Sequence, residues 1–413
     1  MVAAAVETGP FDHLSDLLVG VPLPSTDAEE WRYSRVDRLE TSRYRLAADL
    51  RGAGPLATVP DDVTGIIESL GATSGVAVLV DGALVHCELA DAAAGAGVTF
   101  AVADSDDRGV ADAAHDVFAS LNRAVAESPI ELDVPRTVRL DEPFVVISVV
   151  TSSGAVVAPR VTVRLGDGAA ATLVELHRSG PVDALVVPVT EVTVGRDATL
   201  RHAVVQDLDV SATTVGSLTV TVEDNGTFDG WVAALGADWA RLRMDCRLVG
   251  RGATGNLAAL YAGTGDQMHD LRTFQDHIGR DTSSQLTFKG AVDDRSHAVY
   301  TGLIRIHPEG RGSNAVQSNR ILTLSDEAWA ESVPNLEIEQ NDVRCAHAST
   351  VGPVDADQRF YLESRGVPGD VAERLIVAGF FDEILEQCPS PSVAALVRPR
   401  VAAAIGDAGG ASS

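Results

Sequence analysis

The sequence contains few aromatic residues and almost no lysine. Phe, Trp and Tyr make up 5% of its 413 residues, and Lys289 is the single lysine among 32 basic side chains. Small and β-branched side chains must therefore fill the core, which suits stacked strands better than a helical bundle. The nucleotide-binding loop G-x-x-x-x-G-K-[ST] needs a lysine. Lys289 is followed by Gly290 and no such loop precedes it, so we expect no ATP site of this type.

Cysteine is scarce, and its spacing excludes some kinds of metal site. Cys87, Cys246, Cys345 and Cys388 lie far apart and form no C-x-x-C pair, so neither a zinc ribbon nor a locally supplied four-cysteine cluster is expected. The first residues show no signal-peptide pattern, and no apolar run approaches the roughly 20 residues that span a bilayer. We therefore predict a cytoplasmic protein with reduced thiols and no membrane contact. Cys87 is predicted to be a small buried thiol.

Acidic residues outnumber basic ones by 59 to 32, and the formal net charge is −27. Such a surface repels phosphate backbones, so nucleic acid is not an expected partner. The hydrophobic content of 45% allows a large buried core, and we expect disorder only at the ends of the chain.

Residues 1–128 are predicted to form an N-terminal, mainly helical region. Helical patterns occur at 60–72 and 108–128, and an apolar strand pair occupies 75–90 around Asp81-Gly82. Trp31 and Tyr33 are interpreted as packing anchors. His115 lies on the apolar face of the second helix, where a packed histidine is expected more often than a ligand.

Residues 129–352 change to short β-branched runs separated by glycine and acidic turns. Turn clusters fall at 166–168, 195–197, 224–226 and 250–252, with a spacing near thirty residues at first. The length and the recurring turns favour a parallel β-solenoid, although the pattern alone leaves a double sandwich open. Residues 353–405 then read as a C-terminal helical module, and 406–413 as a disordered tail.

Cys345 and His347 stand two residues apart in a predicted strand at the end of the β-rich region. Side chains at i and i+2 of a strand point to the same face. The two could hold one metal, face a partner together, or pack in a core, and two ligands alone do not make a metal site. His269 and His277 are interpreted as surface or turn residues.

Several short sequence motifs follow one another along the chain in a fixed order. They begin with Glu30-Trp31-Arg32-Tyr33 and continue with Phe118, Leu121-Asn122 and the stretch around His269 and His277. The densest set comprises Gln317-Ser318-Asn319-Arg320, Leu322, Leu324-Ser325, Ala328, Pro334, Leu336-Glu337-Ile338, Asp342-Val343, Cys345, His347, Thr350-Val351-Gly352, Phe360-Tyr361-Leu362, Ser364-Arg365-Gly366 and Phe380. Together, from about residue 29 to 386, they resemble the SufB/SufD family of iron–sulfur cluster assembly proteins, and within it the SufD branch.

The resemblance implies a mainly β fold, with a right-handed parallel β-helix core flanked by N-terminal and C-terminal α-helical regions. It also implies a non-catalytic scaffold subunit. In this family SufD pairs with SufB through the ends of the β-helices, and nascent clusters are built at that interface. A SufC ATPase binds the C-terminal helical module and supplies the ATP hydrolysis.

The resemblance also assigns residues. His347 matches the SufD residue implicated at the interface with SufB, and Cys345 occupies a matched position, so we expect them to hold iron or a transient iron–sulfur cluster together with the partner. The family usually has Cys-Ser-His-Gly-Ala-Thr here, whereas this chain has Ala348 in place of the glycine. The aromatic and basic residues of the helical module are expected to dock SufC, namely Phe360, Tyr361, Arg365, Phe380 and Phe381.

Two other functions stay open at this point. One is a homodimeric β-helix binding protein without a role in cluster assembly. The other is a polysaccharide-active β-helix enzyme, which would need clustered carboxylates in a cleft. The chain could also form a homodimer when SufB is absent, because an exposed solenoid end invites edge pairing.

Overall fold

The computed structural model describes Leu14, Leu18 and residues 23–52, 54, 57–103 and 116–406. Two predicted segments lie outside the described residues. They are the first part of the helix predicted at 108–128, which includes His115, and the predicted tail from residue 407. The rest of that predicted helix is α5 (Val117–Val125). None of the described helices combines the length and the apolar character needed to cross a bilayer.

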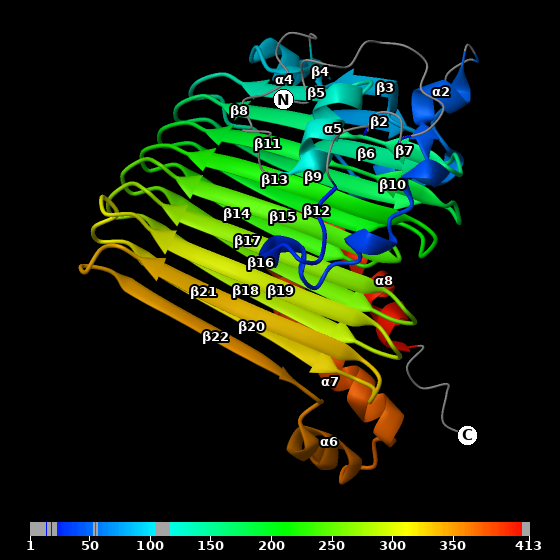
Figure 1. Ribbon diagram of the computed structural model, residues 1–413. Coiled ribbons are helices and arrows are strands. Elements are labelled where there is room, and N and C mark those ends of the chain that lie inside the picture. The colour runs from blue at the N-terminus through cyan, green and yellow to red at the C-terminus, as the bar shows by residue number, and fades with distance from the viewer. Residues whose placement is uncertain are drawn as a thin grey trace.

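The chain winds into a parallel β-solenoid of about eight turns with helices at both ends, as the sequence predicted (Figure 1). Two sheets face each other, and successive long strands alternate between them. Sheet A contains β4 (Thr99–Val102), β5 (Ile130–Val134), β8 (Arg160–Leu165), β11 (Val189–Val194), β13 (Thr213–Val222), β15 (Trp239–Leu248), β17 (Met268–His277), β19 (His297–Ile306) and β21 (Trp329–Ile338), with the short β1 (Arg45–Leu46), β7 (Ala155–Val157) and β10 (Ala184–Val186) beside them.

Sheet B contains β3 (Ala83–Leu89), β2 (Gly75–Val80), β6 (Phe144–Val150), β9 (Ala170–Ser179), β12 (Thr199–Asp207), β14 (Thr227–Ala234), β16 (Thr254–Gly263), β18 (Ser283–Val292), β20 (Asn314–Thr323) and β22 (Arg344–Gly352). Both sheets therefore begin before residue 129, because β2 pairs with β6 and β4 pairs with β5. The pair formed by β2 and β3 is the strand pair expected at 75–90.

Each turn lies in register on the next. Thr213 pairs with Trp239, an offset of 26 residues, and His297 pairs with Trp329, an offset of 32. The drifting repeat seen in the sequence is therefore a variation in loop length between strands that keep their pairing.

The predicted turn clusters form one ladder along the solenoid. One residue in each turn has a positive φ, between 52° and 81°, and its amide donates to a carbonyl of the next turn. Glycine, asparagine and aspartate tolerate this conformation better than other residues do. The ladder consists of Thr137, Gly168, Asp197, Asn225, Gly252, Asp281 and Gly312, so six of its seven members are glycine, asparagine or aspartate.

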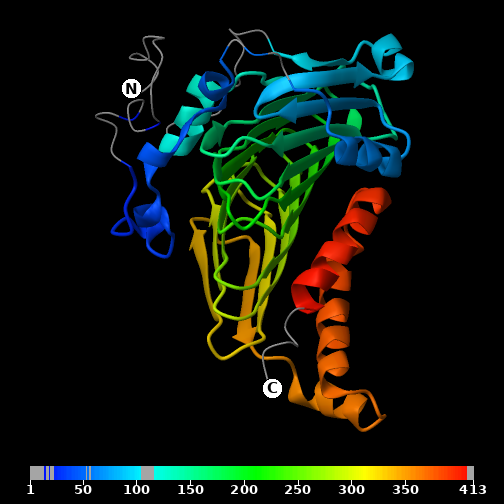
Figure 2. The ribbon, with the colours of Figure 1, turned by 90° about the vertical axis from the view of Figure 1, so that its right-hand side faces the viewer.

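Apolar residues fill the space between the sheets, and two further cores cover their outer faces. Helices α3 (Asp61–Leu70), α7 (Gly369–Leu385) and α8 (Pro391–Gly406) pack on sheet B. The N-terminal segment and α5 pack on sheet A. Figure 2 shows α7 and α8 along one side of the solenoid and the N-terminal segment on the other.

Trp31 and Tyr33 are packing anchors, as predicted. Trp31 is 4% exposed, and the guanidinium of Arg241 lies 3.8 Å from its ring centroid. Tyr33 contacts Trp329 of the last turn of sheet A, with the ring centroids 6.0 Å apart. The N-terminal segment therefore runs along sheet A as far as its final strand.

One cysteine differs from its prediction. Cys87 is exposed, because it lies on β3, the terminal strand of sheet B, where no further strand follows. Its thiol donates to the carbonyl of Phe100 at 3.5 Å. An apolar strand at the edge of a sheet can therefore expose some of its side chains, as β3 exposes Cys87.

Lys289 anchors the C-terminal helices to the solenoid. It lies on β18 and is 4% exposed, and its ammonium donates to the carbonyl of Phe380 at 2.7 Å and to the carboxylate of Glu383. Trp231 adds a second tie, since its indole N–H donates to the carbonyl of Ile384 at 2.7 Å.

Replacing Lys289 by Met should lower the free energy of unfolding by about 1–3 kcal/mol, because the buried carbonyl of Phe380 loses its donor. Urea denaturation measures the change. The control is Glu383→Gln at a mostly exposed carboxylate, which should cost less than about 1 kcal/mol. Equal effects of the two substitutions would contradict the anchoring role.

Candidate functional site at the open end of the solenoid

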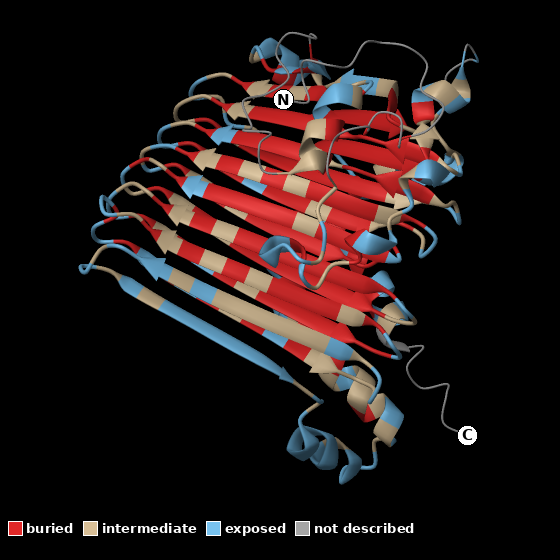
Figure 3. Ribbon diagram, viewed as in Figure 1, coloured by how far each residue is buried: buried red, intermediate tan, exposed pale blue. Residues whose placement is uncertain are grey.

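The solenoid ends in two strands that have no successor. β22 is the terminal strand of sheet B and β21 that of sheet A, and both lie at the same end of the molecule (Figure 1). Each presents a row of backbone groups that no described strand pairs. Figure 3 shows the consequence, since the strands of the middle turns are buried and these two are mostly exposed or half-buried.

Cys345 and His347 belong to the inner face of sheet B. In the parallel register Cys345 pairs with Ala315 and His347 pairs with Gln317. Ala315 and Gln317 are 0% and 1% exposed and lie inside the solenoid. The prediction that the two side chains share one face is confirmed, and that face is the interior of the solenoid where it opens to solvent.

The two side chains differ in exposure. The His347 imidazole is exposed and makes no hydrogen bond or ion pair with any described residue. Cys345 is half-buried, and burial raises the pKa of its thiol, although a hydrogen bond with the backbone of Ala315 acts in the opposite direction. A thiol of this kind stays protonated at neutral pH until a metal ion displaces the proton.

A chain of hydrogen bonds leads from the interior to this open end. The Tyr261 hydroxyl donates to Oδ1 of Asn319 at 2.9 Å, and Nδ2 of Asn319 donates to Oγ of Ser332 at 2.9 Å. Ser349 of β22 donates to the same oxygen at 2.6 Å. The inner faces of the two sheets are thus joined by polar contacts at the end where His347 lies.

Apolar side chains are exposed along the same end. Trp329 and Ile338 lie on β21, Val316 on β20 and Val351 on β22, each between 38% and 46% exposed. Free strand edges that carry apolar side chains are typical of surfaces that pair with another chain. The geometry therefore supports a protein contact around the Cys345–His347 pair.

The aromatic residues of the helical module fall into two groups. Phe360 and Tyr361 of α6 (Ala356–Glu363) are 70% and 57% exposed, and the guanidinium of Arg365 lies 5.0 Å from the Tyr361 ring centroid. Phe381 is fully buried against sheet B, and Phe380 is half-buried beneath Lys289. Only the first group is available to a partner.

The buried residues of α7 are Ala372, Val377, Phe381, Ile384 and Leu385. The last four pack on the outer face of sheet B, while Leu375 is 53% exposed. The helix also contacts α6, so it connects α6 with the solenoid.

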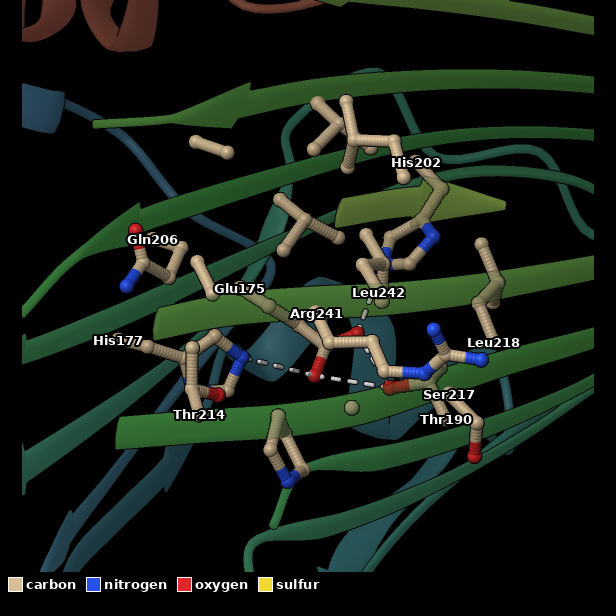
Figure 4. A pocket seen from close by; sticks show the side chains of 17 residues that line it. Glu175, His177, Thr190, His202, Gln206, Thr214, Ser217, Leu218, Arg241 and Leu242 are labelled. Atoms are coloured by element: carbon tan, nitrogen blue, oxygen red, sulfur yellow. Dashed lines mark hydrogen bonds and ion pairs between the residues drawn. The ribbon is translucent and has the colours of Figure 1, made fainter. Parts of the chain in front are cut away.

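The sequence analysis missed a polar cluster inside the middle turns (Figure 4). Glu175 on β9 is 1% exposed, and three side chains converge on its carboxylate. His202 donates from Nε2 at 2.7 Å, Thr190 donates at 2.8 Å, and Nε2 of His177 lies 3.9 Å away. A cavity of about 40 Å³ adjoins the cluster.

The electrostatics of this cluster follow from burial and pairing. Burial opposes ionisation of Glu175, but the hydrogen bonds and charges of its neighbours outweigh it and lower its pKa. Burial lowers the pKa of His177. Among the described residues, no three His, Cys, Asp or Glu side chains converge in a metal-holding geometry. The sequence signal was the pair of polar residues Glu175 and His177 at the inward positions that follow Leu173 in β9.

His269 and His277 are interior residues, so their interpretation as surface or turn residues was wrong. Both are 0% exposed at the two ends of β17. His277 shares hydrogen bonds with Thr282 at 2.8 Å and Ser284 at 2.9 Å. Burial lowers the pKa of each imidazole to about 4.

Comparison with known proteins identifies the class. Residues 148–380 match the family described as "SUF system FeS cluster assembly, SufBD core domain". Iron-sulfur cluster assembly protein SufD of Bacillus subtilis is 28% identical over 277 residues, which cover 66% of this chain and 63% of that protein. An iron-sulfur cluster assembly SufBD family protein of Mycobacterium tuberculosis is 32% identical over 296 residues, which cover 70% of this chain and 72% of that protein.

The fold and these matches define the class, a parallel β-solenoid whose strands match the SufBD core domain. The chain belongs to the SufB/SufD family and is SufD-like. The match spans less than two thirds of the B. subtilis protein.

The buried histidines predict loss of stability in acid. Unfolding releases each imidazole to its ordinary pKa near 6.5, so below that pH the unfolded state binds protons that the folded state does not. The stability that His277 contributes is complete above pH 6.5 and is lost as the pH falls toward 4, by about 3 kcal/mol at most. Thermal unfolding between pH 8 and 5 measures the slope, and His277→Gln should flatten it. An unchanged slope in that variant would contradict the assignment.

Proposed function

We propose that this chain is a scaffold subunit of a cytoplasmic SufB–SufC–SufD assembly and that it has no catalytic activity of its own. Its open end pairs with a SufB-like protein, and its helical module docks a SufC-like ATPase. The observation that carries the proposal is the placement of His347, whose imidazole is exposed, has no partner among the described residues and lies on the inner face of β22.

The open end supports a partner of the same architecture. Two parallel sheets stop there with free strand edges, and a second solenoid end offers edges of the same kind. The exposed apolar residues of β20, β21 and β22 would be covered by such a contact, and Ser332, Ser349 and Asn319 supply directional hydrogen bonds beside them. A second copy of this chain would compete for the same surface, so it could form a homodimer in the absence of SufB.

The donor set at this end fits iron or a nascent iron–sulfur cluster as cargo. A neutral imidazole binds iron well, and a thiolate suits iron–sulfur species. Two side chains do not complete a cluster site, so the partner provides the remaining ligands. Transfer of the cargo then requires that the interface opens and that ligands of an acceptor protein replace those of this site.

The surface around α6 supports docking of SufC. Phe360 and Tyr361 are among the most exposed large apolar side chains of a chain that is poor in aromatics. Arg365 lies over the Tyr361 ring and adds a charge to the same patch. Aromatic and arginine side chains of this kind commonly dominate the energy of protein interfaces. Phe380 and Phe381 act indirectly, because they hold α7 against the solenoid.

Replacing His347 by Ala should leave assembly intact and impair cluster delivery. The chain is co-expressed with SufB-like and SufC-like proteins of the same genome, and maturation of an iron–sulfur enzyme is measured in cells that depend on the system. The expected loss is about tenfold or more, the scale of losing a metal-site group. Thr350→Ala, on the outer face of the same strand, is the control. Normal maturation with His347→Ala would refute the role of this residue, and a chain that remains a homodimer beside SufB would favour the homodimeric binding protein.

The double substitution of Phe360 and Tyr361 by Asp should abolish capture of SufC without loss of SufB. Both side chains are exposed, so the fold tolerates the change, whereas the docking surface gains two charges. Each lost interface anchor is expected to cost about 2 kcal/mol or more of binding free energy. Co-purification measures the outcome, with Val210→Asp at a 60% exposed loop position as the control. If the variant still captured SufC, the docking surface would lie elsewhere on the chain.

A further inference from the structure

One buried amide near the open end has no partner. Gln317 lies on β20 directly beside His347 in the register of sheet B, and it is 1% exposed. Neither Oε1 nor Nε2 of its amide makes a hydrogen bond with any described residue. Each unpaired polar group of this kind lowers the stability of the fold, so its presence inside the solenoid calls for a physical reason.

Several polar side chains on the inner faces nearby are satisfied, although Oε1 of Gln275 on β17 also has no partner among the described residues. Tyr261, Asn319, Ser332 and Ser349 form one hydrogen-bonded chain, and Tyr300 shares a hydrogen bond with Thr273 at 3.0 Å. The interior at this end is therefore able to pair its polar groups. Gln317 stands apart from that network although it lies on the same strand as Asn319, two residues away.

The opposite sheet leaves space for the side-chain amide of Gln317. A Cβ added to Gly302 of β19 would lie 2.5 Å from Nε2 and 2.6 Å from Oε1 of Gln317. Any side chain at residue 302 would therefore displace the amide. The absence of a side chain on one sheet leaves room for the unpaired amide of the other, one strand inward from His347.

The spacing allows Gln317 and His347 to bind one ion. Neighbouring strands lie about 4.8 Å apart, and two bonds from nitrogen or oxygen ligands to a first-row metal add up to about 4.2 Å. Two in-register side chains that lean slightly together can therefore share one ion. Cys345 lies on the same inner face of β22, two residues from His347.

We propose that Gln317 is a third metal ligand beside Cys345 and His347. The three side chains together bind one divalent first-row transition-metal ion. The amide oxygen, the imidazole nitrogen and the thiolate sulfur occupy three positions, and a fourth faces the partner. Binding releases the thiol proton of Cys345 to solvent. This inference rests on the proposed function, because it assigns an inner ligand to the same site.

Co(II) is a suitable probe, since its visible absorption reports both thiolate ligation and coordination number. The full-length chain is titrated with Co(II) under reducing, oxygen-free conditions. We expect one equivalent to bind with a thiolate-to-metal absorption band. Gln317→Leu should weaken binding by about tenfold or more, and Gln317→Glu should keep or tighten it, because a carboxylate oxygen replaces the amide oxygen. Gln285→Leu, at an exposed outer position of β18, should change nothing.

Thermal unfolding separates ligand loss from damage to the fold. Leu removes an unpaired buried amide, so Gln317→Leu should unfold at the same temperature as the unsubstituted chain or above it. Weaker Co(II) binding by a variant that is no less stable would support the inference.

Three outcomes would overturn the inference. If Gln317→Leu binds Co(II) as the unsubstituted chain does while His347→Ala does not, Gln317 is not a ligand and the proposed function stands. If the unsubstituted chain binds no Co(II), the three donors do not form a site by themselves. If His347→Ala also leaves binding unchanged, the ion binds elsewhere; the maturation assay with His347→Ala then tests the proposed function separately.

Discussion

In-register parallel stacking is the constraint on which the rest of this structure depends. Every inward side chain rests on the equivalent side chain of the neighbouring turns, so a row such as Leu286, Gln317 and His347 runs along the solenoid. Within the stack, each turn satisfies the backbone of the turn before it. The last turn has no successor, and its inner side chains and strand edges are therefore offered to whatever binds there. The candidate site needs no special loop, because it is the place where the repeat stops.

The C-terminal helical module begins directly after the open end of the solenoid. β22 finishes at Gly352 and α6 begins at Ala356, where Asp355 accepts hydrogen bonds from the amides of Asp357 and Gln358. The open end and the exposed patch of α6 are thus joined by a short capped connection. From there α7 returns along sheet B and is tied to it through Lys289 and Trp231. A protein bound at Phe360 and Tyr361 would lie next to one bound at β22 and not on a remote part of the chain.

Much of this architecture could be predicted from local patterns. Turn residues with positive φ recur at glycine, asparagine and aspartate, and the i, i+2 rule placed Cys345 and His347 on one face. The errors arose where the environment was set by distant strands. Cys87 is exposed because β3 is the terminal strand of sheet B in the described part of the chain. Burial of His269 and His277, and convergence of His202 on Glu175, required pairings between residues about one turn apart that no local pattern contains.

Polar side chains inside the solenoid have different roles, depending on the turn in which they lie. Glu175 lies in the middle turns, where His202 and Thr190 pair with its carboxylate and the enclosing strands keep solvent away. A closed cluster of this kind can specify register, since slipping either strand by one residue would turn a charged side chain toward the opposite face of the sheet. Gln317 carries a comparable cost without such partners, and it lies one strand from the end. An unpaired polar group near the terminal turn can be satisfied by what binds there. The position of Gln317 one strand from the open end therefore favours a role in binding.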